Sequence, residues 1–143
     1  MKAIFIFLSV LLLSPGFFSY CATNDTAFEE LRFELQKEGV SGEFIKVTEP
    51  YVKKMMLSKA PIAEIKPVLL DMWKDGVKGR ALKNAANAVS ELVASGDNAK
   101  DAAQIASLAA HKAEAEGLGG FGIGMRVKKA VAERKAYLKS LKK

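Results

Sequence analysis

Glu38-Gly39-Val40-Ser41-Gly42-Glu43-Phe44-Ile45 is the stretch that decides the fold of this chain, because its pattern occurs three times. Residues 75–82 (DGVKGRAL) and 116–123 (EGLGGFGI) repeat it: an acid, glycine, an aliphatic residue, any residue, glycine, two further residues and an apolar one. The first glycine suits the left-handed conformation that closes a helix, and the aliphatic residue can pack back on the last turn. The second glycine stands where another helix must begin. Each copy therefore predicts a helix, a tight turn and a second helix.

The spacing of these connectors predicts the architecture. Gly39, Gly76 and Gly117 are 37 and 41 residues apart, a period typical of two-helix repeats. The 143 residues include few aromatics and only four prolines, which favours an all-α chain. We therefore expect one domain of five to six helices in antiparallel hairpins. About three units is the minimum for repeat stacking, so both a small closed bundle and a short open helical repeat fit the pattern.

The connectors also carry a resemblance. Gly-Val-x-Gly or Gly-Leu-x-Gly steps between Ala- and Leu-rich helices resemble those of uncharacterised exported bacterial helical-repeat proteins, over residues 26–138. Such proteins often have Pro or Ser after the Gly-Val step, where this chain has Ser41, Lys78 and Gly119, so the match is partial. The resemblance implies an exported helical repeat and assigns no functional residue.

The first 22 residues have the pattern of a secretory signal peptide. Lys2 precedes an apolar run at residues 3–13, and Ser14-Pro15-Gly16 then interrupts it. This pattern predicts removal of residues 1–22 and a periplasmic or secreted mature domain at residues 23–143. An uncleaved membrane anchor is the alternative, although the run is short for a span. Cys21 could instead become the lipidated first residue of a lipoprotein, for which the preceding Tyr20 is a poor match. The cleavage site therefore stays open.

Helical periodicity and turn residues place the remaining elements. Helices are expected at residues 26–38, from about 42, from about 61, at 79–95, at 98–116 and from 117 to about 141. Pro50 should break or kink the second helix, and Pro67 should kink the third. Asp97 is expected to cap the fifth helix. Glycines at 120, 122 and 124 each cost up to about 1 kcal/mol relative to Ala, so the start of the last helix is expected to fray. We expect these extra glycines to form a loosened joint before that helix.

The net charge of +6 is concentrated in residues 125–143, which predict a basic amphipathic helix with Arg134 intruding on its apolar side. The residues expected to bind an anionic partner are Arg126, Lys128, Lys129, Lys135, Lys139, Lys142 and Lys143. The partner could be a protein or an anionic envelope surface, including membrane headgroups. A solvated helix face without a partner and insertion of residues 117–143 into lipid are the alternatives. Nucleic acid is disfavoured, because export is predicted and only Tyr137 interleaves the charges.

The remaining residues give little support to catalysis or to a cofactor. A lone Cys21 and a lone His111 make neither an internal disulfide nor a zinc cluster. The glycine-rich residues 117–124 follow a helix and precede no Lys-Ser/Thr pair, unlike a phosphate loop. We therefore expect an interaction protein that is not an enzyme and has no metal or cofactor. Met55, Met56, Met72 and Trp73 are core residues by the simplest interpretation, and line a soft pocket for an apolar ligand by the alternative. The sequence indicates neither the partner, the pathway nor the oligomeric state.

Overall fold

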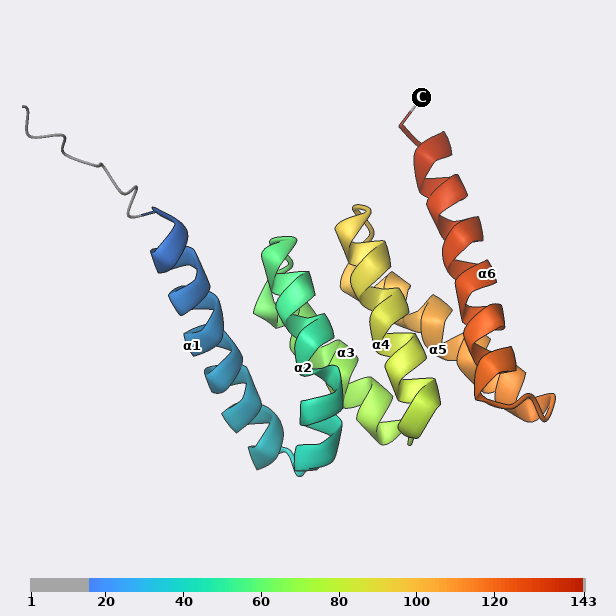
Figure 1. Cartoon of the computed structure of the whole chain (residues 1–143), viewed down its shortest axis with the longest axis horizontal. Helices are drawn as coiled ribbons and strands as arrows, with labels where there is room; N and C mark the ends of the chain where they lie inside the picture. Colours follow the sequence, from blue (N-terminus) through green and yellow to red (C-terminus); the bar gives the residue numbers. More distant parts are fainter. Residues whose placement is uncertain (1–15, 143) are drawn as a thin grey trace, which may run out of the picture.

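The computed structural model describes residues 16–142, with side chains from residue 24 onward, and within this part the chain is all-α (Figure 1). The predicted removal of residues 1–22 and the lipidation of Cys21 therefore lie outside what the structure describes, as does Lys143. The described helices are α1 (Gly16–Lys37), α2 (Gly42–Leu57), α3 (Ile62–Lys74), α4 (Gly79–Ala94), α5 (Ala99–Ala115) and α6 (Gly120–Ser140). The predicted all-α class and the predicted number of helices are confirmed.

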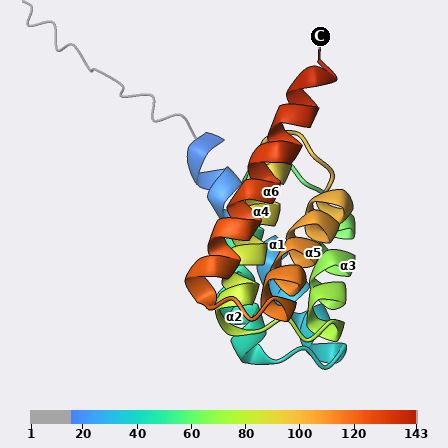
Figure 2. The ribbon, with the colours of Figure 1, turned by 90° about the vertical axis from the view of Figure 1, so that its right-hand side faces the viewer.

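The helices form an open array of two layers (Figures 1 and 2). In one layer α2 packs against α4 and α4 against α6, while α3 packs against α5 in the other. At one end α1 packs against α2 and α3, and at the opposite end α6 packs against α4 and α5. The two terminal helices lie far apart, so the short open repeat describes the fold and the closed bundle does not.

The three repeated connectors have the predicted geometry. Gly39, Gly76 and Gly117 have φ values of 83°, 72° and 74°, the left-handed conformation that glycine adopts without strain. In the first copy the Val40 amide donates to the Leu35 carbonyl at 3.1 Å, which is the longer bond of a Schellman motif. The helices α2, α4 and α6 begin at the second glycine of each copy. The repeat therefore both ends and begins helices.

The same geometry occurs at two connectors that the sequence pattern did not reveal. Lys59, after α2, and Gly96, after α4, have φ values of 64° and 96°. The amide after Lys59, that of Ala60, donates to the Met55 carbonyl at 3.1 Å, as in the first copy. Among the described residues Lys59 alone has positive φ without being glycine. All five connectors are therefore equivalent, and the structural unit is one helix followed by one connector.

Three local predictions are wrong. The helix expected at residues 26–38 begins at Gly16, because neither glycine nor proline interrupts the chain from residue 17 to 37. The break expected at Pro50 does not occur, because α2 continues through it, whereas Pro67 lies within α3 as predicted. Both prolines are exposed, so the carbonyl that each leaves without an amide donor faces water. The cap of α5 is Asn98 instead of Asp97, with the Asn98 side chain accepting the Asp101 amide at 2.8 Å.

The apolar side chains form one continuous core along the array. The Ala-rich helix α5 is thin, as its sequence predicts, and packs against α3, α4 and α6. Ala102, Ala106 and Ala110 on its inner side are at most 1% exposed. Between residues 16 and 142 no helix is both long enough and apolar enough to span a membrane.

Candidate interaction surface on α6

The last helix, α6, is held to the array along one side by apolar side chains. Ile123, Val127 and Val131 recur at four-residue spacing and are 6%, 3% and 6% exposed. They face α4 and α5, the two helices that α6 contacts. Among the described helices none packs on the opposite side of α6, which lies at one end of the array (Figure 1). The basic residues of this helix can therefore be sorted by whether they face the array or point away from it.

The glycines at the start of α6 allow close packing. A Cβ atom on Gly120 would lie 2.5 Å from Cδ of Arg80 on α4, and one on Gly124 would lie 3.4 Å from Nδ2 of Asn84. A Cβ atom on Gly122 would lie 2.9 Å from Cβ of Leu118 in the preceding connector. These glycines lie inside the helix, which begins at Gly120. They bring the start of α6 against α4, and the predicted loosening of this joint stays a prediction.

Arg134 anchors the middle of α6 to the connector between α4 and α5. Its Nε and Nη2 atoms donate to Oδ2 and Oδ1 of Asp97, both at 2.8 Å, and Nη2 also donates to Asp101 at 3.2 Å. The Asp97 side chain is 2% exposed and that of Arg134 is 21% exposed. The hydrogen bonds to Asp97 raise the pKa of Arg134 above its usual value. Arg134 is therefore an internal anchor, which explains a cation on the apolar side of the helix.

This pair could be identified in the sequence because each of its two residues stands at a position where the local pattern has an apolar residue. Asp97 occupies the connector position that is apolar in the others, such as Val40 and Val77. Arg134 occupies a position of α6 where the helical pattern requires an apolar residue. Each is anomalous alone, but together they are opposite charges in two apolar patterns. Pairing of the two side chains explains both exceptions, because each charge at an otherwise apolar position then has a partner of opposite charge.

Two further predicted partner-binding residues are paired within the chain. Arg126 donates to Glu116 at 2.6 Å, and Lys135 donates to Glu91 on α4 at 3.2 Å. Partial burial raises the pKa of Glu91, but hydrogen bonds from Lys135 and Asn87 together with nearby positive charge lower it below its usual value. Lys135 therefore faces the groove between α4 and α6 and contributes to holding the helix.

Three of the predicted cations remain exposed on α6, where Lys128 borders the groove with α4 and Lys129 borders the groove with α5. Lys128, Lys129 and Lys139 are exposed, and none has a carboxylate partner on another helix within the described part of the chain. Lys129 lies 4.0 Å from Glu133 one turn along, with both side chains about 70% exposed. A pair this exposed contributes little to stability. Lys142 is also exposed, but its ammonium lies beside Gly96 instead of on the outward side.

Apolar side chains accompany these cations. Phe121 and Met125 are 83% and 56% exposed, and helical spacing places them on the same side as Lys128 and Lys129. Tyr137 and Leu141 are exposed for another reason, since the end of α6 extends past the neighbouring helices (Figure 2). We define the outward α6 face as Phe121, Met125, Lys128, Lys129 and Lys139.

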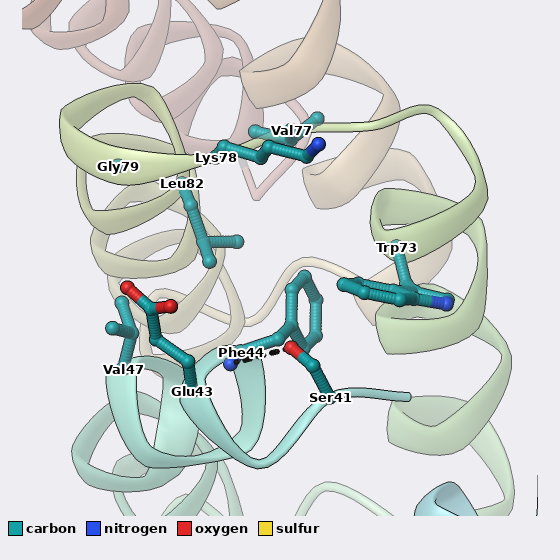
Figure 3. Close-up of a pocket in the computed structure, with 9 residues that line it drawn as sticks. All are labelled: Ser41, Glu43, Phe44, Val47, Trp73, Val77, Lys78, Gly79 and Leu82. Carbon is teal, nitrogen blue, oxygen red and sulfur yellow. Dashed lines mark hydrogen bonds between the residues drawn. The ribbon is translucent and has the colours of Figure 1, made fainter. Parts of the chain in front are cut away.

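Apart from the outward α6 face, the structure has a hollow at the junction of α2, α3 and α4 (Figure 3). It has a volume of about 300 Å³ and is lined mainly by apolar side chains, with Glu43 and Lys78 at its edge. Trp73 and Phe44 meet edge to face across it, with ring centroids 5.5 Å apart. The Ser41 hydroxyl accepts the Phe44 amide at 3.3 Å, which caps α2 and fixes this ring. The hollow could hold a small apolar group.

The four residues predicted to line an apolar pocket do not come together. Met55, Met56 and Met72 are buried in the core at 2%, 6% and 2% exposure, and none of them lines the hollow with Trp73. Met72 instead reaches a shallow groove between α3 and α5, together with Leu108. The structure thus places the methionines in the core and Trp73 at a pocket whose other walls the sequence analysis missed.

The fold and the surface define a class of protein: an open array of helices joined by equivalent Schellman connectors, with a cationic and partly apolar face on its last helix. Comparisons with models of protein families, with curated proteins and with solved structures found no match to this chain. No group of three or more His, Cys, Asp or Glu side chains arranged to hold a metal ion occurs in the part of the chain that the structure describes.

Proposed function

We propose that this protein is an exported, non-enzymatic interaction protein whose last helix docks to an anionic partner, either a protein or the envelope surface. The observation that carries the proposal is the division of the cations on α6. Arg126, Arg134 and Lys135 bind carboxylates outside α6, whereas Lys128, Lys129 and Lys139 are exposed and, among the described residues, have no carboxylate partner outside this helix. A structural role explains the first three cations and leaves the outward three for a partner.

The outward α6 face also has the composition of a docking surface. Protein interfaces combine exposed aromatic residues and methionine with a charged periphery. Phe121 and Met125 supply the apolar part, Lys128 and Lys129 supply positive charge about one turn further along the helix, and Lys139 lies nearer its end. Ile123, Val127 and Val131 are buried against α4 and α5, so insertion of α6 into lipid would require its detachment from the array. Docking without detachment is therefore the interpretation that the geometry favours.

Co-sedimentation with the native envelope fraction tests the proposal. The triple variant Lys128→Gln/Lys129→Gln/Lys139→Gln should lose most of the bound fraction seen with wild type at low salt. The matched control Lys46→Gln/Lys83→Gln/Lys100→Gln removes three exposed lysines from α2, α4 and α5, and should bind as wild type does. Equal losses in both variants would mean that binding follows net charge alone, and no loss in the first would refute the docking surface.

The same assay with protein-free vesicles separates the two kinds of partner. Binding to anionic vesicles that depends on the three outward lysines would identify lipid headgroups as the partner. Binding only to the complete envelope fraction would identify a protein. A shift of Trp73 emission is not expected in either case, because Trp73 lies on α3, away from α6.

The Trp73 hollow supports a second candidate function, as a carrier of a small apolar ligand. Phe44, Val47 and Leu82 provide an apolar lining, and the volume of about 300 Å³ is at the low end for ligand sites. Titration with a panel of small apolar ligands should change Trp73 fluorescence if the hollow binds them. A Leu82→Phe variant would partly fill the hollow without adding a second tryptophan and should weaken the change, and unchanged wild-type fluorescence across the panel would exclude this candidate.

A further inference from the structure

The first helix of the array presents a face complementary to that of the last. On α1, Phe28, Leu31 and Leu35 are at most 2% exposed and face α2 and α3. Helical spacing places Glu29, Glu30 and Phe33 on the opposite side, where all are exposed, together with Lys37, whose ammonium lies over the Phe33 ring. Phe33 is 59% exposed. We define the outward α1 face as Glu29, Glu30 and Phe33.

Both terminal helices are bare on one side because the array is open (Figure 1). Of the seven large apolar side chains that are exposed among the described residues, four lie on these two helices, and Leu141 directly follows α6. Terminal repeats of a stable solenoid usually present a polar outer side, and an apolar residue at its centre indicates contact with another surface. Phe33 at one end, and Phe121 with Met125 at the other, break that rule at both ends of this array.

We propose that the partner of the outward α6 face is the outward α1 face of a second copy of this chain, so that copies associate head to tail. The inference rests on the proposed function, since it identifies the anionic partner of that surface. In this arrangement Lys128 and Lys129 lie opposite Glu29 and Glu30, with the exposed aromatic residues between them. The layers then continue from one copy into the next, as they do from helix to helix within the chain.

The local contacts of the two faces do not oppose this association. Within α1, Glu29 lies 3.4 Å from Arg32, and the Lys37 ammonium lies 4.3 Å from the centre of the Phe33 ring. Within α6 the corresponding contact is the 4.0 Å pair of Lys129 with Glu133. All of these charged groups are exposed, and such pairs contribute little. They can be exchanged for contacts between copies at small cost.

The symmetry of this contact predicts its products. Different surfaces of the two copies meet, so the contact is heterologous and leaves a free α6 face and a free α1 face on every open assembly. Such a contact produces rings if the rotation between copies closes, and open chains of increasing length if it does not. A two-fold dimer is not expected, because neither face is complementary to itself.

Sedimentation velocity with charge-reversed variants tests the inference. The protein should be produced from its full-length coding sequence, so that any processing is that of the cell. One variant is Lys128→Glu/Lys129→Glu and the other is Glu29→Lys/Glu30→Lys. At about 0.01 M salt, where the screening length is about 30 Å, wild type should form species larger than a monomer that increase with concentration. Each variant alone should associate at least about tenfold more weakly, because its two ends then carry the same charge.

Mixing the two variants is the decisive step, because opposite charges then meet again at both kinds of contact. The mixture should associate as wild type does, which also shows that both variants are folded. The control Lys83→Glu/Lys100→Glu, on exposed sites of α4 and α5, should retain wild-type association. A monomeric wild type, a mixture that stays monomeric, or association unaffected by both reversals would overturn the inference. If wild type is monomeric but envelope binding still requires the outward lysines, the inference fails and the proposed function stands.

Discussion

Replacing Lys59 by glycine is expected to stabilise the protein. Lys59 occupies the left-handed position of the connector after α2, with φ of 64°, where the other four connectors have glycine. A non-glycine residue in this conformation costs about 1–2 kcal/mol. Glycine recovers this cost but adds about 0.4–1 kcal/mol of conformational entropy to the unfolded chain. The hydrogen bonds of the connector use only main-chain atoms and are unchanged. The net gain should be about 0.5–1 kcal/mol.

Thermal and urea unfolding of Lys59→Gly and wild type measure this gain. For a domain of this size it corresponds to an increase in Tm of roughly 2–5 °C, with the urea m-value unchanged. Gly76→Lys is the matched reversal, because Gly76 has φ of 72° and a Cβ there would contact no atom within 4 Å. It should lower the stability by a similar amount. If Lys59→Gly were neutral or destabilising while Gly76→Lys behaved as expected, the five connectors would not be equivalent.

Three further outcomes are expected. Arg134→Met should lower Tm because it leaves the buried Asp97 carboxylate unpaired, and adding Asp97→Leu should recover most of the lost Tm. If the double variant instead lost the sum of the two single losses, Arg134 and Asp97 would not stabilise the fold as a pair. The pKa of Glu91 is lowered in the folded protein, so ionised Glu91 stabilises the fold above its unfolded pKa of about 4.3, and this stabilisation is lost as the pH falls through the folded pKa. Measured by urea unfolding, the free energy of unfolding should therefore decrease less below about pH 4.5 in Lys135→Gln than in wild type. Gly124→Ala should raise Tm through a helix-propensity gain of up to about 1 kcal/mol, because the added Cβ would make only a 3.4 Å contact with the Asn84 side chain; an unchanged or lower Tm would contradict this.

Much of the fold could be predicted because its determinants are local. A glycine followed by an aliphatic residue ends a helix through contacts within a few residues, so three of the five connectors were evident. Breaks between helices were also predicted near the other two, but they were not recognised as equivalent, because Lys59 replaces the glycine of one and Asp97 replaces the apolar residue of the other. The expected break of the helix at Pro50 was wrong for a related reason. Whether Pro50 interrupts a helix depends on whether its side of the helix is exposed, which is decided by packing.

The candidate surface was predictable only in part, because pairing of charges is a long-range property. The sequence placed seven cations in one C-terminal set without separating anchors from free charges. Arg134 and Lys135 meet carboxylates that lie 37 and 44 residues earlier in the chain. The spacing along α6 contains no information about these partners. The methionines near Trp73 show the same limit, since proximity in sequence did not place Met72 at the same hollow as Trp73.

The reactivity of individual lysines towards an acetylating reagent tests the docking surface most directly, because it requires no knowledge of the partner. Mass spectrometry would compare the purified, dilute protein with the protein in its native envelope fraction. Lys128, Lys129 and Lys139 should become protected in the native fraction. Lys46, Lys83 and Lys100, which are exposed elsewhere, should react equally in both. Equal reactivity of the three outward lysines in both samples, or protection confined to the other three, would contradict the proposal that α6 is the docking element.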